Sequence, residues 1–197
     1  KVCGLTDFKN LQEVLQLQPD YVGFIFYKGS SRYAREKLSY ENVRVLKMKT
    51  KKTGVFVNST IEEILELKEL YALDLVQLHG DESPDFCESV RKFIPVIKTF
   101  LVGENFSLRL INDYSEVCDY FLFDTQSNQR GGSGEKFDPV LLNGYNLEKE
   151  FFFAGGIQHT DRKNLEFDFS KFIHAFDLNS KFELSAGIKD TELLKQF

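Results

Sequence analysis

The sequence of 197 residues has no tryptophan, one methionine, four prolines and three cysteines. The cysteines form no C-x-x-C pair and have no histidine at zinc-site spacing, which argues against a disulfide framework and a structural metal centre. A signal-peptide pattern is lacking at the start, and no apolar run reaches the roughly 18 residues that a membrane span needs. These absences predict a cytoplasmic protein without a metal ion or a membrane segment.

A large excess of one charge is also lacking. Lysine and arginine number 25 and aspartate and glutamate 30, which gives a net charge of −5 and a pI of about 5.3. Such a chain is a poor partner for nucleic acid, although a local basic pocket for one small anion is compatible with it. The hydrophobic fraction of 42% and the length suffice to bury a core without disulfides, so we expect one domain over residues 1–197.

Apolar segments of strand length recur along the chain, separated by turn residues. Most of them are continuously apolar instead of alternating, which is typical of strands that are covered on both faces in a parallel sheet. The pattern therefore predicts an α/β protein. The eight predicted strands are residues 2–3, 21–26, 53–57, 75–78, 96–99, 120–124, 151–154 and 172–177.

Helix-start signals lie between these segments. They are Asp7, a capping box of Ser59 with Glu62, Ser83 before Pro84, Asp138 before Pro139, and Thr160 or Asp161. Residues 106–117 and 190–197 complete the alternation, and only the stretch after the sixth strand looks too short for a full helix. Cys87 and Cys118 are expected on apolar helix faces.

Eight strands that alternate with helices either close into a (β/α)₈ barrel or form an open doubly wound sheet. The first strand is not followed by a G-x-G-x-x-G turn. An open sheet of eight parallel strands would also leave two exposed edges, whereas eight strands close with a filled interior. We therefore predict a single-domain TIM barrel and keep the open sheet as the alternative.

Polar side chains follow several predicted strands, where the active sites of barrels lie. Cys3 ends the first strand beside a predicted helix start that would stabilise a thiolate, so it is either a base or nucleophile or a small buried hydrophobe. Asp124 ends the sixth, apolar strand, where loss of water raises the pKa of a carboxyl. It is either a general acid or a turn residue. Strands one and six lie three places apart in a ring of eight, so the two residues would face each other across the mouth.

Arg32 and His79 are the other candidates with reactive side chains. Arg32 follows the second strand, and its guanidinium fits a carboxylate with two parallel hydrogen bonds unless it is a solvated surface charge. His79 follows the fourth strand and is a possible mouth residue, acting as ligand or base, or else a hydrogen-bonded structural residue. No local spacing supports a metal site of Cys3, His79 and Asp124.

Two loops are suited to an anion. Gly155 and Gly156 end the seventh strand, where backbone N–H groups can approach an oxyanion closely. Asn179 and Ser180 end the eighth strand, and a helix starting there would share that anion between strands seven and eight. A second glycine cluster, residues 131–134 with Lys136, is either a loop over the mouth or a substrate-contacting turn.

Taken together, these stretches resemble the phosphoribosylanthranilate isomerase family of tryptophan biosynthesis over nearly the whole chain. The segments that carry the resemblance are KVCGLT at 1–6, GFIF at 23–26 with SRY at 31–33, GVFVN at 54–58, VQLHGDE at 76–82, FDT at 123–125, GGSG at 131–134, AGGI at 154–157, DLNS at 177–180 and GIKD at 187–190.

The resemblance implies a (β/α)₈ barrel without a cofactor that catalyses an aldose–ketose isomerisation, the Amadori rearrangement of N-(5-phosphoribosyl)anthranilate. The product would be 1-(2-carboxyphenylamino)-1-deoxyribulose 5-phosphate. By similarity, Asp124 is the general acid that opens the ribose ring, Cys3 is the general base at C2, and Arg32 holds the anthranilate carboxylate. The phosphate would lie between Gly155–Gly156 and Asn179–Ser180. The partner is thus a small phosphorylated molecule, and the protein is expected to be a monomer or a homodimer.

The chain departs from the family pattern at two places. Lys181 and Phe182 stand where glycine and valine are usual, which puts a backbone approach to phosphate there in doubt, although Lys181 offers a compensating charge. Ser31 stands where proline is common.

Three other interpretations of the polar residues at the predicted strand ends remain. A related barrel for another phosphorylated aromatic or sugar substrate would use interior lysine and glutamate, which these strand ends do not show. A silent phosphate binder would have no reason to keep both Cys3 and Asp124. A Cys3–His79 hydrolase would need those side chains in hydrogen-bonding contact.

Overall fold

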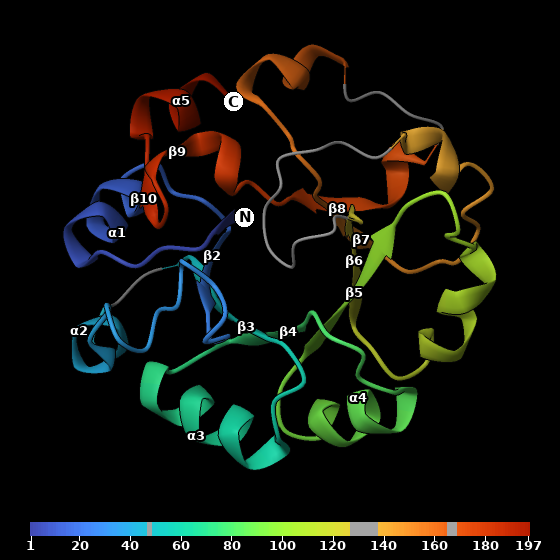
Figure 1. Ribbon diagram of the computed structural model, residues 1–197, viewed down its shortest axis with the longest axis horizontal. Helices are drawn as coiled ribbons and strands as arrows, with labels where there is room; N and C mark the ends of the chain where they lie inside the picture. The colour runs from blue at the N-terminus through green and yellow to red at the C-terminus, as the bar shows by residue number, and fades with distance from the viewer. Residues whose placement is uncertain (47–48, 127–137, 165–168) are drawn as a thin grey trace.

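Eight strands, β1 to β8, form one ring, which Figure 1 shows end-on with helices around its outside. The computed structural model describes residues 1–46, 49–126, 138–164 and 169–197. All neighbouring strands in the order β1 to β8 are parallel. Their bounds are β1 Val2–Cys3, β2 Tyr21–Ile25, β3 Lys51–Phe56, β4 Leu75–Leu78, β5 Val96–Val102, β6 Tyr120–Thr125, β7 Phe151–Phe153 and β8 Ile173–Phe176.

The ring is closed by pairing between β1 and the residues just after β8. Val2 and Leu178 form an isolated parallel bridge. The backbone N–H of Cys3 donates to the Leu178 carbonyl over 2.9 Å, and the N–H of Leu178 donates to the Lys1 carbonyl over 2.9 Å. The prediction of a (β/α)₈ barrel is therefore confirmed, and the open doubly wound sheet is wrong.

The helices around the barrel differ between its two halves. The α-helices are α1 Phe8–Leu15, α2 Tyr40–Arg44, α3 Ile61–Tyr71, α4 Pro84–Arg91 and, at the end of the chain, α5 Thr191–Gln196. From β5 to β8 the described connections contain 3₁₀ turns: η1 Leu108–Tyr114, η2 Pro139–Leu142, η3 His159–Asn164 and η4 Ser170–Phe172. After β8 come η5 Ser180–Phe182 and an antiparallel hairpin of β9 Glu183–Ser185 and β10 Ile188–Lys189.

Most predicted helix caps are present. The side chains of Asp7 and Ser83 accept hydrogen bonds at the starts of α1 and α4, and Asp138 caps η2 in the same way. The predicted capping box at Ser59 is wrong by one residue. Thr60 is the cap of α3, because its hydroxyl accepts from the backbone N–H of Glu63.

The helix predicted over residues 106–117 is a 3₁₀ helix. Leu108, Ile111 and Tyr114 recur every three residues, which places them on one face of a helix with three residues per turn. Ile111 is buried and the other two pack against the core. The predicted helix face for Cys118 is also wrong, because this residue is buried in the loop before β6, whereas Cys87 is buried on α4 as expected.

Side chains fill the amino end of the barrel and leave the carboxyl end open. A buried cluster from five strands fills the interior below the open end. It consists of Tyr21, Leu75, Ile97, Leu122, Phe152 and Ala154. Since strand residues alternate between the two faces, interior positions recur every second residue toward the mouth. The next interior residues on three of these strands are Gln77, Thr99 and Asp124. No helix in the described part of the chain has the length and apolarity to cross a membrane.

Candidate active site

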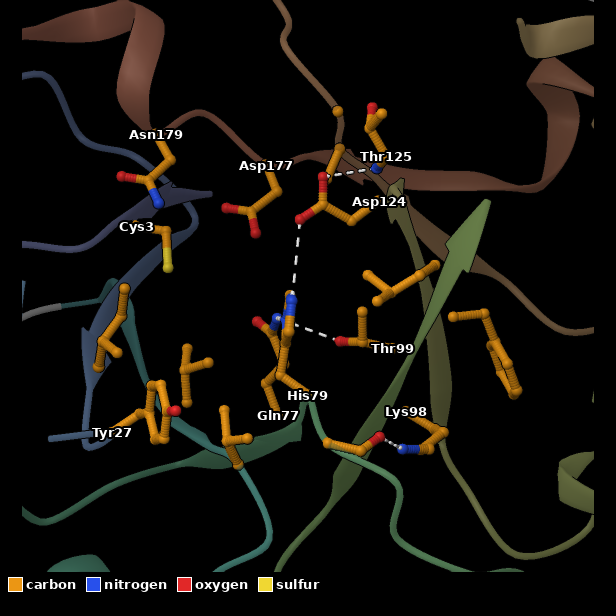
Figure 2. Close-up of a pocket in the computed structure, with 18 of the residues that line it drawn as sticks. Cys3, Tyr27, Gln77, His79, Lys98, Thr99, Asp124, Thr125, Asp177 and Asn179 are labelled. Carbon is orange, nitrogen blue, oxygen red and sulfur yellow. Dashed lines mark hydrogen bonds and ion pairs between the residues drawn. The ribbon is translucent and has the colours of Figure 1, made fainter. Parts of the chain in front are cut away.

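A cavity of about 510 Å³ lies at the carboxyl ends of the strands, and Figure 2 shows many of its lining residues. Seven of the predicted site residues line it: Cys3, His79, Asp124, Gly155, Gly156, Asn179 and Ser180. Cys3 and Asp124 project from different sides, with Asp177 between them, as the strand order around the ring requires. The predicted pairing of a thiol with a carboxyl across one cavity is therefore present.

Cys3 is held in a buried niche at the end of β1. Its side chain packs so closely against β2 that a Cβ atom on Gly23 would come within 2.7 Å of the sulfur. Burial raises the pKa of the thiol above its ordinary value, while the nearby charges of Lys1 and Lys189 act to lower it. The site thus contains two cations that stabilise a thiolate once it forms.

Asp124 is a partly exposed carboxyl at the end of β6, next to the backbone of Thr125 and the ring of His79. Burial raises the pKa of this carboxyl above its usual range. The opposing effects are the charge that His79 carries when it is protonated, a hydrogen bond from Thr125 and the charge of Lys1. That bond runs from the Thr125 backbone N–H to Asp124 Oδ1 over 2.8 Å. The other oxygen, Oδ2, is directed toward His79. A carboxyl of this kind can donate a proton closer to neutral pH than an exposed aspartate.

His79 lies between two polar neighbours. Its Nδ1 is 3.0 Å from the amide nitrogen of Gln77, and its Nε2 is 3.9 Å from Asp124 Oδ2. Burial lowers the pKa of the imidazole, which favours the neutral ring. Because these contacts direct both ring nitrogens away from Cys3, the alternative of a Cys3–His79 hydrolase pair is not supported.

Two further lining residues, Gln77 and Asp177, and the buried Lys1 that joins them were not predicted as site residues. The buried ammonium of Lys1 donates to Gln77 Oε1 over 2.9 Å and to Asp177 Oδ2 over 2.6 Å. Asp177 lines the cavity, and its second oxygen is buried and has no hydrogen-bond partner among the described residues. Period-two alternation from Cys3 and His79 was the available sequence signal, since it places Lys1 and Gln77 on the interior face.

Arg32 lies beside the cavity instead of lining it. Its Nε and Nη2 atoms donate to the carboxylate of Glu183, with the shortest contact at 2.6 Å. Lys189 donates to the same carboxylate over 2.7 Å and to Asn179 Oδ1 over 2.7 Å. The fork-to-carboxylate geometry predicted for Arg32 is present, but the carboxylate is that of Glu183 on β9.

The predicted anion loops meet at one end of the cavity. Gly155 and Gly156 have φ values of +92° and +62°, a left-handed conformation that favours glycine. Ser180 and Lys181, which come after the neighbouring strand β8, also line the cavity. The helix expected to begin at Ser180 is only the three-residue turn η5, so a full helix dipole is lacking there. The glycine cluster 131–134 and Lys136 lie outside the described residues.

Comparison with known proteins gives one consistent family. The family model described as N-(5′-phosphoribosyl)anthranilate (PRA) isomerase matches residues 1–197. A curated N-(5′-phosphoribosyl)anthranilate isomerase from Parabacteroides distasonis is 39% identical, with 100% of this chain and 90% of that protein covered.

Solved structures agree with this match. The crystal structure of phosphoribosyl anthranilate isomerase from Thermotoga maritima superposes with a TM-score of 0.86 at 30% identity and covers 100% of this chain and 94% of its own. A structure of such an isomerase in complex with reduced 1-(o-carboxyphenylamino)-1-deoxyribulose 5-phosphate gives a TM-score of 0.82 at 28% identity, with the same coverage.

Proposed function

The chain belongs to the N-(5′-phosphoribosyl)anthranilate isomerase family, from which we infer that it isomerises N-(5′-phosphoribosyl)anthranilate to 1-(2-carboxyphenylamino)-1-deoxyribulose 5-phosphate in tryptophan biosynthesis. The observation that carries this function is the family match over residues 1–197. The cavity supports it, because a thiol, a carboxyl and an anion loop line one space of about 510 Å³, which is of the size of small-molecule sites.

Asp124 is the general acid in this proposal. Its carboxyl donates a proton to the ring oxygen of the ribose, the bond between C1 and that oxygen breaks, and the nitrogen lone pair forms a C1=N bond. The buried position of Asp124 supports this role, because burial raises its pKa and so keeps the proton available.

Cys3 is the general base of the second step. Its thiolate removes the proton from C2, the freed electron pair forms a C1=C2 bond, and the C1=N electrons return to nitrogen to give a neutral enolamine. The enolamine then loses its C2 hydroxyl proton and gains a proton at C1, which gives the ketone. At the end of the reaction Cys3 has gained one proton and Asp124 has lost one, so the enzyme carries the same number of protons as at the start. Proton exchange through water returns the thiolate and the carboxylic acid.

The two anionic ends of the substrate require separate sites. Backbone N–H groups of Gly155, Gly156 and Ser180 receive the phosphate in this proposal. The anthranilate carboxylate binds the edge of the Arg32 guanidinium that carries Nη1, because Glu183 occupies the edge formed by Nε and Nη2. Glu183 then orients the guanidinium instead of competing with the substrate.

The unpartnered oxygen of Asp177 suits a substrate hydroxyl. A buried carboxylate oxygen without a donor is costly, and a ribose hydroxyl would satisfy it. Because Asp177 lies between Cys3 and Asp124, that hydroxyl would be close to the reacting carbons.

The direct test is the change in anthranilate fluorescence as substrate generated in situ is rearranged. We expect turnover by the protein purified from a host without its own isomerase. Asp124→Asn, prepared in parallel, serves as the control for contaminating activity. A folded wild-type protein that produces no ketone product would overturn the proposed function.

A further inference from the structure

A chain of polar side chains crosses the floor of the cavity from one side to the other. It runs from Asp177 to Lys1 over 2.6 Å, from Lys1 to Gln77 over 2.9 Å, and from Gln77 to His79 over 3.0 Å. It ends where His79 Nε2 faces Asp124 Oδ2 at 3.9 Å. The last distance is too long for a direct hydrogen bond, so the chain stops one short step from the carboxyl that acts as acid.

The order of donors and acceptors in this chain is determined by Lys1. An ammonium group only donates, so the Gln77 atom that contacts Lys1 must be the amide oxygen. The amide nitrogen of Gln77 then points the other way and donates to His79 Nδ1 and, over 3.2 Å, to Thr99 Oγ1. Gln77 is 2% exposed, and every polar atom of its side chain has a partner. The reverse orientation of the amide would lose the bond from Lys1 and would bring two donors, the ammonium and the NH₂ group, face to face.

The consequence for His79 concerns the position of its proton. Because Nδ1 accepts a hydrogen bond from Gln77, the proton of the neutral ring must be on Nε2. That nitrogen is the one directed toward Asp124. The opposite tautomer would present a lone pair to the carboxylate and would leave two donors facing each other at Nδ1.

We propose that Lys1 and Gln77 are positioning residues that hold His79 as its Nε2–H tautomer, so that His79 donates a hydrogen bond to the Asp124 carboxylate formed when the acid gives up its proton. The inference rests on the proposed role of Asp124. In the empty site the gap is 3.9 Å, and catalytic hydrogen bonds of this kind commonly shorten when substrate is bound.

This arrangement stabilises an anion on a carboxyl that is only partly exposed to water. Asp124 must become charged during ring opening, although burial favours its neutral form. The charged groups that act on His79 are Asp124 and Asp177, which favour its protonated form, and Lys1 and Lys98, which oppose it. A protonated His79 would stabilise the Asp124 carboxylate before the reaction and would make Asp124 lose its proton too early. A neutral His79 stabilises the carboxylate less, so Asp124 holds its proton until ring opening, and His79 can still donate a hydrogen bond to the carboxylate that then forms.

The tautomer can be measured without any activity. In ¹⁵N-labelled protein, the ring nitrogens of His79 should appear with Nε2 protonated and Nδ1 unprotonated. Gln77→Glu is nearly isosteric, but its carboxylate only accepts, so Nδ1 of His79 should gain a proton in that variant. His174 is the internal control, since its Nδ1 lies 2.7 Å from the Glu150 carboxylate and should be protonated in both proteins. A protonated Nδ1 of His79 in the wild type, or an unprotonated one in Gln77→Glu, would overturn the proposal.

Kinetics provide a second test through two substitutions at His79 itself, which is less buried than Gln77. His79→Gln places an amide near the position of Nε2 and keeps a donor for Asp124, whereas His79→Asn places it near Nδ1 and removes that donor. We expect kcat to fall about 10- to 100-fold further in His79→Asn than in His79→Gln, with KM changed by less than about threefold in both. Equal losses of kcat would contradict the donor role. A wild type without isomerase activity, in contrast, would refute the proposed function and leave the tautomer measurement unaffected.

Discussion

His174 at the amino end of the barrel and His79 at its carboxyl end differ in how completely their ring nitrogens are paired. His174 Nε2 lies 2.7 Å from the Tyr21 hydroxyl, and its Nδ1 lies 2.7 Å from Glu150. His79 has one partner at 3.0 Å, and its second nitrogen faces a carboxyl at 3.9 Å. The two rings also carry their neutral protons on opposite nitrogens, because Glu150 only accepts whereas Gln77 donates.

The surroundings of the two histidines also differ, because His174 is packed among side chains and His79 lines an open space. His174 packs against aromatic rings of Tyr21, Tyr120 and Phe152, with centroid distances of 4.5 to 5.7 Å. His79 lines the open cavity. The amino end of a barrel thus uses saturated polar contacts for stability, and the carboxyl end keeps unsatisfied groups that a substrate completes.

The largest effect is expected from Cys3→Ala at the carboxyl end. Loss of the base should lower kcat by about 10²- to 10⁴-fold, while substrate still binds, because proton transfer is lost and not affinity. Single-turnover rates and product-analogue binding measure the two quantities separately. Near wild-type turnover of Cys3→Ala would falsify the assigned role.

Asp124→Asn should have an effect of similar or slightly smaller size on kcat, since an amide has no acidic proton to give. The pH profile of kcat/KM of the wild type should have one limb for Asp124 and one for Cys3, and the variant should lose the first. An unchanged profile would show that the acid lies elsewhere.

The same variant tests whether the carboxyl end has lower stability because of its function. The pKa of Asp124 is raised in the folded protein, so folding retains a proton that the unfolded chain releases, and stability falls as pH rises from the unfolded to the folded pKa. Asp124→Asn removes that loss. We therefore expect its unfolding midpoint at neutral pH to exceed that of the wild type, and the two to converge in acid. A lower midpoint at neutral pH would contradict this account.

A smaller effect, on binding, is expected at Arg32. Arg32→Met should weaken binding of ligands with the anthranilate carboxylate by about 2–5 kcal/mol, provided that the pair is desolvated. The fold should survive because Lys189 still neutralises Glu183 at 2.7 Å. Glu183→Gln keeps the guanidinium but orients it less strongly, so its effect should be smaller. Equal weakening for a ligand that lacks the carboxylate would mean that Arg32 acts on structure or on the phosphate.

Local patterns along the chain were sufficient to predict the barrel and the position of Cys3 and Asp124 in one cavity, but not the network beneath them. Continuous apolar segments and turn residues locate the strands, and Cys3 and Asp124 stand out because they follow such segments. Lys1 contacts Gln77 across 76 positions and Asp177 across 176. No local period encodes these distances, and only closure of the ring brings the three side chains together.

The pairing of Arg32 illustrates the same limit. An arginine guanidinium in a polar loop predicts a bound carboxylate, and the structure contains one. That carboxylate belongs to Glu183, which lies 151 positions away on β9. The 3₁₀ helix at Leu108–Tyr114 was misassigned for a different reason. A spacing of three residues fits an α-helical stripe nearly as well, and helix type depends on packing that the sequence pattern does not contain.

At the amino end, His174→Gln should reduce stability and leave catalysis intact. Loss of the two contacts to Tyr21 and Glu150 should cost about 1 kcal/mol, a modest value because the Glu150 side chain is 57% exposed. Denaturant unfolding measures this cost, and kcat should stay within about twofold of the wild type. Tyr21→Phe is the matched control, since burial raises the pKa of Tyr21 to about 12 and its hydroxyl remains a donor. If His174→Gln lowers activity by more than its lower stability accounts for, the amino end also contributes to catalysis and the contrast between the two ends is wrong.

The smallest effect is expected at Lys181, which lies at the rim of the cavity where the family usually has glycine. Its side chain is exposed, and its φ is not in the left-handed region, so the backbone there does not require glycine in this chain. Backbone N–H groups at Gly156 and Ser180 are available to an anion, and a long exposed ammonium stays hydrated and screened by salt. Lys181→Gly should therefore change product-analogue affinity by less than about threefold at both low and high salt. A loss of more than about tenfold that is concentrated at low salt would show instead that Lys181 binds the phosphate and replaces the backbone approach that glycine provides in the rest of the family.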